Sequence, residues 1–155
     1  YLKNKRLKLY GLDLSKKAIK DGEKKYKNIK FYNQSSLNLE KLNLKVDLII
    51  CDFLYLLDRK YIFQQFGQIY NSLNYDGFLI ICDFDPSFTH FNFDKRNRNL
   101  ISYKMNYSQF LCGSNLFKIK YLNKWLTNDK NFISKDISVS LYQKIDYFKE
   151  FPPNL

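Results

Sequence analysis

A chain of 155 residues is long enough for one domain with a single hydrophobic core. Its hydrophobic content of 45% and aromatic content of 18% exclude an intrinsically disordered chain. No apolar run is long enough to cross a bilayer, so no membrane partner is expected.

The net charge of +11 results from 26 Lys and Arg residues against 15 Asp and Glu residues. Most of the excess is lysine, spread along the chain among Asn, Ile, Tyr and Phe, which indicates compositional bias rather than a stripe that binds nucleic acid. Nucleic acid is therefore the second choice of partner, after a small molecule.

Three cysteines, Cys51, Cys82 and Cys112, form no CxxC pair, and the first two fall within apolar runs. We expect them to be small, buried, reduced thiols, which favours a cytoplasmic location. His90 is the only histidine, so no metal site is expected.

The first half of the chain alternates short apolar runs with amphipathic segments. Strands are predicted at residues 7–13, 29–32, 48–51 and 78–82, and we expect the strand at 48–51 to be covered on both faces. Helices are predicted at residues 14–27, capped by Ser15, and 59–73, capped by Asp58, with a loop or short helix at 37–45. Residues 74–77 predict a turn in which Gly77 stops the second helix.

The second half of the chain differs from the first in its amino-acid composition. Residues 83–99 are rich in Asp, Asn, Phe and Pro and predict a long functional loop, followed by a short irregular or helical piece at 100–111. Residues 116–126 and 137–145 predict an antiparallel pair, joined by a polar turn at 128–131, that closes one sheet edge. Residues 1–6 predict a basic lead-in and residues 146–155 a tail. Together these elements predict one α/β domain over residues 1–155, with a doubly wound, mostly parallel sheet.

Three predicted strands end in an acid, namely Asp13, Asp52 and Asp83. Because ligands bind outside the carboxyl ends of parallel strands, we expect these acids to line one rim. Asp13 could also simply cap the following helix. Asp52 or Asp83 could act as a general base, and hydrogen bonding to nearby loop backbone is an equal alternative. His90 is a third candidate base, although a surface histidine is the simpler interpretation.

The order of three segments resembles the class I S-adenosylmethionine-dependent methyltransferases. The segments are Tyr10-Gly11-Leu12-Asp13-Leu14-Ser15, residues 46–52 and residues 73–81. The resemblance covers residues 7–83 and implies a Rossmann-like fold, S-adenosyl-L-methionine as cofactor and methyl transfer as activity. It also implies a cofactor-binding half at residues 1–83 and a substrate side at 84–155, where residues 102–108 resemble a substrate-side segment of some bacterial members.

The resemblance assigns roles to individual residues. Asp13 stands where the family binds the ribose hydroxyls, and Leu14 where it packs on adenine. Ser35 and Ser36 occupy the position that meets the adenine amine, where the family often has Asp. Asp52 and Phe53 stand where the fourth strand of the family faces cofactor and substrate.

One departure concerns the family's glycine-rich loop, which follows its first strand. None of the five glycines here forms a GxGxG pattern, and no strand is predicted before residue 7. The resemblance therefore implies that the chain begins after that strand and leaves two sheet edges unpaired. It predicts that these 155 residues alone bind S-adenosylmethionine weakly or not at all.

The predicted function is methyl transfer to a small-molecule or sugar-type acceptor, incomplete in this chain alone. The basic charge suggests an RNA or protein methyltransferase instead, and the missing glycine loop suggests a non-catalytic α/β interaction subunit. Aromatic side chains are expected either to wall an acceptor pocket or to fill space under the loop. They are Tyr55, Phe88, Phe91, Phe93 and Tyr103. The sequence does not identify the acceptor, the catalytic base or the oligomeric state.

Overall fold

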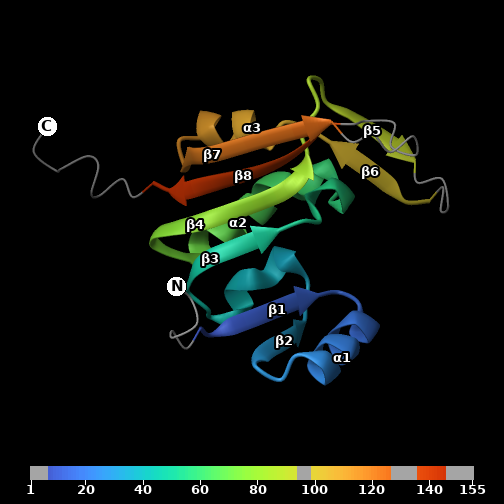
Figure 1. The fold of residues 1–155 in the computed structure, drawn as a ribbon, viewed down its shortest axis with the longest axis vertical. Coiled ribbons are helices and arrows are strands. Elements are labelled where there is room, and N and C mark those ends of the chain that lie inside the picture. The colour runs from blue at the N-terminus through green and yellow to red at the C-terminus, as the bar shows by residue number, and fades with distance from the viewer. Residues whose placement is uncertain (1–6, 94–98, 127–135, 146–155) are drawn as a thin grey trace, which may run out of the picture.

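The computed structural model describes residues 7–93, 99–126 and 136–145. Within these ranges the strands form three sheets (Figure 1). In pairing order they are β1 (Leu9–Asp13) with β2 (Ile29–Asn33); β3 (Val46–Cys51), β4 (Leu73–Phe84), β8 (Asp136–Lys144) and β7 (Phe117–Leu126); and β5 (His90–Phe93) with β6 (Ile101–Lys104). The helices are α1 (Lys16–Lys25), α2 (Ile62–Ser72) and α3 (Tyr107–Gly113), with 3-10 turns η1 (Ser36–Leu42), η2 (Leu54–Leu56) and η3 (Arg59–Tyr61).

Parallel pairing joins β1 to β2 and β3 to β4, whereas β8 runs antiparallel to both β4 and β7. Figure 1 shows the arrowheads of β1, β3 and β4 at the same end of the molecule. The predicted α/β architecture with a closing antiparallel pair is thereby confirmed. The predicted turn at residues 128–131 and the segments 1–6 and 146–155 lie outside the described residues.

Both predicted helix caps are present, but the second caps a different helix. The hydroxyl of Ser15 accepts a hydrogen bond of 3.2 Å from the amide of Ala18 and so begins α1. The predicted helix at 59–73 is divided into η3 and α2. Asp58 caps η3, because its carboxylate accepts a hydrogen bond of 3.1 Å from the amide of Lys60.

The prediction that Gly77 stops a helix was wrong. Helix α2 ends at Ser72, and residues 74–77 form an irregular stretch of β4 at which its pairing with β3 shifts. The left-handed backbone conformation falls on Asp76, with a φ of 57°. Gly77 is needed for a close approach instead, because a Cβ there would lie 2.9 Å from the carbonyl oxygen of Asn74.

The predicted loop at residues 83–99 contains a strand. β5 pairs antiparallel with β6, and His90 lies opposite Lys104 in the register. The segment at 100–111, predicted as one irregular piece, divides into β6 and α3. Asn106 begins α3 by accepting a hydrogen bond of 3.0 Å from the amide of Gln109. Backbone pairing of a short hairpin thus orders residues whose apolar pattern is too brief to predict a strand.

The hydrophobic core lies between one face of the four-stranded sheet and the helices α2 and α3. Leu79 and Ile81 of β4 are almost fully buried against Phe66 and Ile69 of α2. The rings of Phe66 and Phe110 lie 5.2 Å apart between centroids and join α2 to α3. Alternate residues of β4 therefore face the core, as the pleat of a strand requires.

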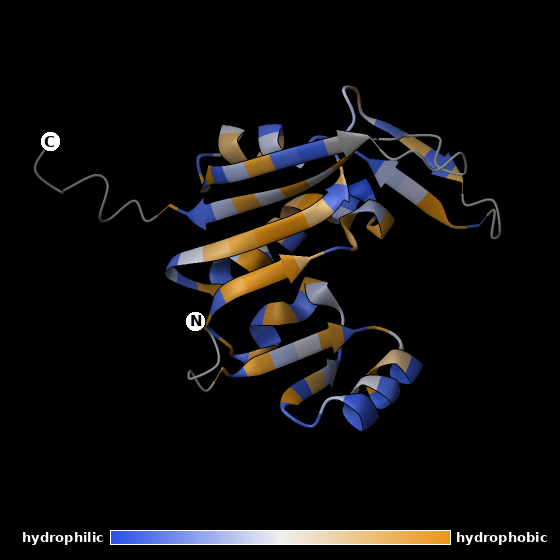
Figure 2. Ribbon diagram, in the orientation of Figure 1, coloured by the Kyte–Doolittle hydropathy of each residue, from blue (hydrophilic) through white to orange (hydrophobic). Residues whose placement is uncertain are grey.

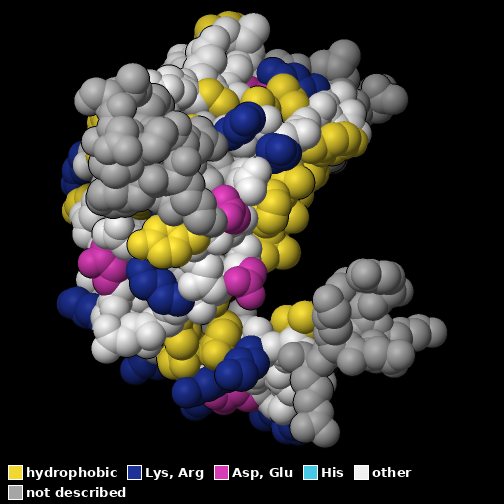
Figure 3. Space-filling view, turned by 90° about the vertical axis from the view of Figure 1, so that its left-hand side faces the viewer, with side chains coloured by type: hydrophobic (Ala, Val, Ile, Leu, Met, Phe, Trp, Pro, Cys, Tyr) yellow, Lys and Arg dark blue, Asp and Glu magenta, His cyan; other side chains and the backbone are white. Residues whose placement is uncertain are grey.

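The opposite face of this sheet is not covered by any described helix. Leu48 and Ile50 of β3 are 46% and 64% exposed, and Cys82 of β4 is exposed beside them in the sheet. Figure 2 shows β3 and β4 as the most hydrophobic ribbons, and Figure 3 shows hydrophobic side chains along one edge of the molecule. Two predictions were therefore wrong. Residues 48–51 are not covered on both faces, and Cys82 is not buried.

The edges of β1 and β3 that face each other have no backbone partner among the described residues. β1 pairs only with β2, and β3 pairs only with β4, although β1 and β3 are neighbouring ribbons that point the same way (Figure 1). Contacts of η1 with α2 connect the two sheets instead. One such contact is the hydrogen bond of 2.9 Å from the amide of Glu40 to the side-chain oxygen of Gln68. The expectation of two unpaired edges is confirmed within the described part of the chain.

Candidate functional site

Three carboxylates lie where the parallel strands finish. Asp13 is the last residue of β1, Asp52 directly follows β3, and Asp83 is the penultimate residue of β4. Figure 1 shows these strand ends on one side of the molecule. In open α/β sheets, ligands bind outside this edge. The rim is therefore the candidate functional site.

Asp13 has one carboxylate oxygen engaged and one without a hydrogen-bond partner among the described residues. Its Oδ1 accepts a hydrogen bond of 2.7 Å from the amide of Ser15, so Asp13 also helps to begin α1. The side-chain amide of Asn33 donates to the carbonyl oxygens of Asp13 and Leu14, at 3.0 and 2.9 Å, and fixes the turn between them. Leu14 is 73% exposed. At the rim, the free carboxylate oxygen of Asp13 is thus followed directly by the exposed apolar side chain of Leu14.

Ser35 and Ser36 are both used within the fold. The hydroxyl of Ser35 accepts a hydrogen bond of 3.2 Å from the amide of Leu37 and caps η1. The hydroxyl of Ser36 donates to the side-chain oxygen of Gln65 at 2.6 Å. Of the two, only Ser35 keeps its hydroxyl proton for another partner.

Asp52 and Phe53 occupy the turn after β3 with different environments. The carboxylate of Asp52 is exposed, whereas Phe53 is half-buried and packs against the core. The carbonyl oxygen of Phe53 accepts a hydrogen bond of 2.9 Å from the amide of Leu56. This bond begins η2, which brings Tyr55 to Asp83.

Asp83 is the buried acid of the rim, 4% exposed. Its Oδ1 accepts a hydrogen bond of 2.6 Å from the amide of Phe84, and its Oδ2 accepts one of 3.0 Å from the amide of Tyr55. Burial raises the pKa of Asp83 to about 7 despite these amide donors, and the charge of Asp52 adds to the rise. A carboxyl group with a pKa near neutrality is suited to take up a proton.

The sequence did not single out the cations beside Asp83. Lys104, the last residue of β6, is 3% exposed, and its ammonium nitrogen lies 3.9 Å from the centroid of the Phe84 ring. Arg59 donates a hydrogen bond of 3.0 Å to the carbonyl oxygen of Lys104 and lies over the ring of Tyr103 at 5.7 Å. Burial lowers the pKa of Lys104, and the charge of Asp83 opposes that shift. In a chain with 26 Lys and Arg residues, no sequence signal distinguishes these two.

His90, Phe91 and Phe93 lie on β5 of the β5–β6 hairpin, and Phe88 lies just before it. The Nδ1 atom of His90 lies 3.0 Å from the carbonyl oxygen of Phe88, to which it can only donate. Phe88, Phe91 and Phe93 are exposed, and Phe91 contacts the ring of Tyr103 at 6.5 Å between centroids. Neither His90 nor these phenylalanines has a described contact with Asp83.

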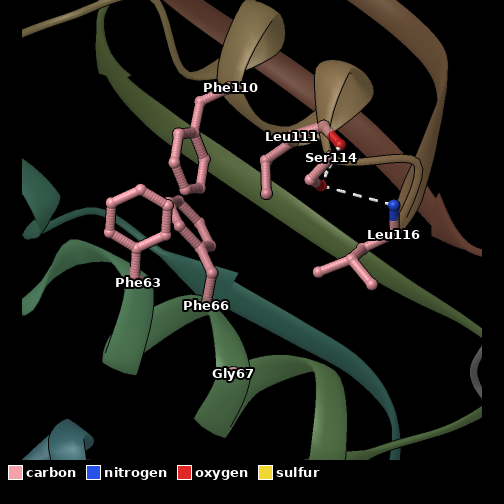
Figure 4. Close-up of a pocket in the computed structure, with 7 residues that line it drawn as sticks. All are labelled: Phe63, Phe66, Gly67, Phe110, Leu111, Ser114 and Leu116. Carbon is pink, nitrogen blue, oxygen red and sulfur yellow. Dashed lines mark hydrogen bonds between the residues drawn. The ribbon is translucent and has the colours of Figure 1, made fainter.

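A separate apolar groove of about 310 Å³ lies between α2 and α3 (Figure 4). Phe63 and Phe66 form one wall and Phe110 and Leu111 the other, and Ser114 donates a hydrogen bond of 2.7 Å to the Leu111 carbonyl. None of the rim carboxylates lines this groove.

The described residues contain neither a metal-binding cluster nor a membrane-spanning helix. No group of three or more His, Cys, Asp or Glu side chains there is arranged to hold a metal ion. No helix in the same ranges has the length and hydropathy needed to cross a membrane.

Comparison with solved structures defines the class of fold. A SAM-dependent methyltransferase from Methanosarcina mazei superposes with a TM-score of 0.71 at 14% identity, over 88% of this chain and 81% of that one. A 1,6-didemethyltoxoflavin-N1-methyltransferase from Burkholderia thailandensis, solved with 1,6-didemethyltoxoflavin and S-adenosylhomocysteine, gives 0.65 at 13%, over 88% and 61%. An rRNA methylase from Streptococcus thermophilus gives 0.57 at 15%, over 90% and 74%. The fold is therefore that of the SAM-dependent methyltransferases.

Residues 1–144 also match a family described as methyltransferase domains. Because the match spans most of the chain, this chain belongs to that methyltransferase family. No curated protein sequence is significantly similar to it. The expected enzyme class, a methyltransferase, and the expected cofactor, S-adenosylmethionine, are thus confirmed at the level of the family.

Proposed function

We propose that this chain carries the nucleoside-binding and acceptor-binding parts of an S-adenosylmethionine-dependent methyltransferase that acts on a small-molecule or sugar-type acceptor. The observation that carries the proposal is the arrangement of Asp13, Asp52 and Asp83 at one rim of a methyltransferase-type sheet. Within this rim, exposed Asp13 suits binding of the cofactor, and buried Asp83 suits uptake of the acceptor's proton.

The residues at the end of β1 fit the nucleoside end of the cofactor. The free oxygen of Asp13 can accept a hydrogen bond from a ribose hydroxyl, and exposed Leu14 can pack against adenine. Ser35 can donate its hydroxyl proton to the base, and Phe53 supplies an apolar side chain on the substrate side. The methionine end has no matching GxGxG segment in the sequence. These residues therefore fit one end of the cofactor only.

S-adenosylmethionine, when bound, supplies an activated methyl group, so the protein has to bind, align and deprotonate the acceptor. Asp83 takes the acceptor proton on a carboxylate oxygen, since its pKa of about 7 leaves much of it ionised at neutral pH. Asp52 and His90 remain less suitable bases, because Asp52 is exposed and the Nδ1 of His90 is bound to Phe88. Tyr55 holds the carboxylate of Asp83 through its backbone amide, and its half-buried ring contacts Phe84 at 5.4 Å.

A small acceptor is favoured because the candidate base, Asp83, is only 4% exposed, which gives a bulky macromolecule poor access. RNA is the second candidate, supported by the net charge of +11 and by the similarity to an rRNA methylase. Steeply salt-dependent binding of RNA would favour it. A non-catalytic α/β interaction subunit is the third and would bind no cofactor. The free cysteines among the described residues support the proposed cytoplasmic location.

Titration with S-adenosylhomocysteine, followed by NMR, tests the proposal. We expect weak binding that perturbs Asp13 and Leu14, and an Asp13→Asn variant that binds at least about tenfold more weakly, since a charge-assisted hydrogen bond is lost. Asp21→Asn, at an exposed position of α1, is the matched control. Equal binding by Asp13→Asn and the wild type would refute the assignment of Asp13.

A further inference from the structure

The side chain of Lys104 is buried without a hydrogen-bond or ion-pair partner among the described residues. Only 3% of the residue is exposed, and its ammonium nitrogen lies 3.9 Å from the Phe84 ring centroid. A cation–π contact replaces only part of the hydration that a lysine loses on burial. The ammonium group of Lys104, which has no such partner, therefore retains the capacity to donate hydrogen bonds to a ligand.

The backbone around Lys104 is fixed by neighbouring elements. Arg59 of η3 donates a hydrogen bond to the carbonyl oxygen of Lys104 at 3.0 Å, and its guanidinium group rests on the Tyr103 ring. Lys104 thus lies on a braced strand end rather than on a free loop. Because the backbone at Lys104 is already ordered, a ligand that binds there loses little free energy to ordering of the protein.

Asp83 does not neutralise Lys104 through a direct contact. Both carboxylate oxygens of Asp83 accept backbone amides, from Phe84 and Tyr55, and no salt bridge joins it to Lys104. The two groups are close enough for the charge of Asp83 to affect the pKa of Lys104. Tyr107, also 3% exposed, is influenced by the charges of Asp83 and Arg59 and lies within the same cluster.

We propose that Lys104 forms an acceptor subsite for an anionic oxygen group, a carboxylate or a phosphate ester, carried by the small molecule that is methylated. This inference rests on the proposed function, because it places the subsite beside the base Asp83. The anionic group of the acceptor pairs with Lys104, and its hydroxyl or amine is then held near the carboxylate of Asp83. The rings of Phe84 and Tyr55, 5.4 Å apart between centroids, form an apolar surface beside Lys104 that is suited to an aromatic or ring-shaped acceptor.

Benzoate and phenyl phosphate are suitable probes, with benzamide as the neutral counterpart of benzoate. Each is titrated into the chain without cofactor and followed by NMR at the backbone amides of Tyr103 and Lys104. We expect both anions to bind, and the one that binds more tightly identifies carboxylate or phosphate as the preferred group. Benzamide should bind at least about tenfold more weakly than benzoate, because a charged hydrogen-bond partner is lost. Lys104→Met should weaken the anions to the level of benzamide.

Lys60→Met is the matched control, because Lys60 belongs to the adjacent turn η3 and its side chain is 64% exposed. This variant should bind benzoate as the wild type does. A second readout, the NMR titration of the Lys104 side chain, needs no variant and remains available if Lys104→Met does not fold. The pKa of Lys104 should rise when benzoate is present and stay unchanged with benzamide.

Equal binding of benzoate and benzamide, or an unchanged pKa of Lys104 with benzoate, would overturn the subsite. Because these titrations need no cofactor, they are independent of the S-adenosylhomocysteine experiment. Failure of benzoate to bind while S-adenosylhomocysteine binds removes only the subsite. Equal binding of S-adenosylhomocysteine by Asp13→Asn and the wild type removes the proposed nucleoside site and leaves an anion site at Lys104.

Discussion

The backbone amide of Tyr55 donates a hydrogen bond of 3.0 Å to the Oδ2 atom of Asp83, which joins the turn after β3 to the end of β4. A second amide, that of Phe84, binds the Oδ1 atom. Both bonds favour the ionised carboxylate, whereas burial favours the neutral acid, and burial dominates, since the pKa rises to about 7. The acid is thus held in place by backbone donors while remaining able to gain a proton.

Replacement of Asp83 by Asn should flatten the dependence of stability on pH. A carboxyl group with a raised pKa binds its proton more tightly in the folded chain, so its stabilising contribution is lost as the pH rises from the unfolded value of 3.8 to about 7. The pKa difference corresponds to at most about 4 kcal/mol in the free energy of unfolding. Urea unfolding of the wild type and Asp83→Asn at pH 5 and pH 8 measures this contribution.

The wild type should lose stability relative to Asp83→Asn between these two pH values. The control is Asp21→Asn, which removes an exposed carboxylate on α1 and should reproduce the wild-type profile. Parallel profiles for the wild type and Asp83→Asn would show that Asp83 is ionised throughout this range and is not a tuned acid.

Binding of S-adenosylmethionine to these 155 residues should be weaker than micromolar. The nucleoside end has candidate partners in Asp13 and Leu14, but no GxGxG segment provides backbone amides for the methionine end. In the described part of the chain, the edges of β1 and β3 that face each other are unpaired, so the sheet is not continuous at this part of the rim. Isothermal titration calorimetry measures the affinity, and a submicromolar Kd would contradict the expectation.

Much of the fold could be predicted because short apolar runs and helix caps are local signals. Ser15 begins α1 through its own side chain, and the apolar residues of β3 and β4 are consecutive in the sequence. The antiparallel pair β7–β8 was predicted for the same reason, since both strands are long. The acids that end β1 and β4, Asp13 and Asp83, follow directly from these strand positions.

Other features depend on contacts between residues far apart in the sequence. Nothing near Gly77 indicates that its backbone will approach the carbonyl oxygen of Asn74 after a shift in strand register. An apolar run also cannot show that Ile50 faces an uncovered side of the sheet, because covering depends on other elements. Lys104 becomes distinctive only through its burial beside Phe84 and Asp83.

The two faces of the four-stranded sheet should respond differently to a polar substitution. Ile50→Thr changes a residue that is 64% exposed and should alter the free energy of unfolding by less than about 1 kcal/mol. Ile81→Thr, on β4, places a hydroxyl in the core at a site 1% exposed and should destabilise by about 2–4 kcal/mol. Urea unfolding of both variants compares them directly. A comparable loss for Ile50→Thr would mean that this face is covered in solution.

Ile50→Thr should also reduce binding of a hydrophobic dye such as ANS. Leu48 and Ile50 are exposed near each other on β3, and exposed apolar patches of this kind bind such dyes or other proteins. The matched change Phe63→Ser, at an exposed position of α2, tests whether the apolar groove between α2 and α3 contributes instead. Loss of dye binding in Phe63→Ser but not in Ile50→Thr would assign the signal to the groove.

Gly11 and Gly22 are expected to be essential for the packing of α1 on β1 and β2, because the ring of Phe31 lies against both. A Cβ at Gly11 would lie 2.5 Å from Cδ1 of Phe31, and one at Gly22 would lie 2.8 Å from Cε1 of the same ring. Gly11→Ala should therefore destabilise by about 1–3 kcal/mol, the usual effect of overpacking. Thermal unfolding monitored by circular dichroism measures the change.

Gly67→Ala provides the control, because a Cβ at this position of α2 meets nothing within 4 Å. Alanine there should stabilise the helix by roughly 0.5–1 kcal/mol, since glycine loses more backbone entropy on folding. The double variant Gly11→Ala with Phe31→Leu separates the causes, as a smaller side chain at 31 relieves the clash. If the double variant is as unstable as the sum of its single changes, the ring of Phe31 is not the reason that Gly11 is required.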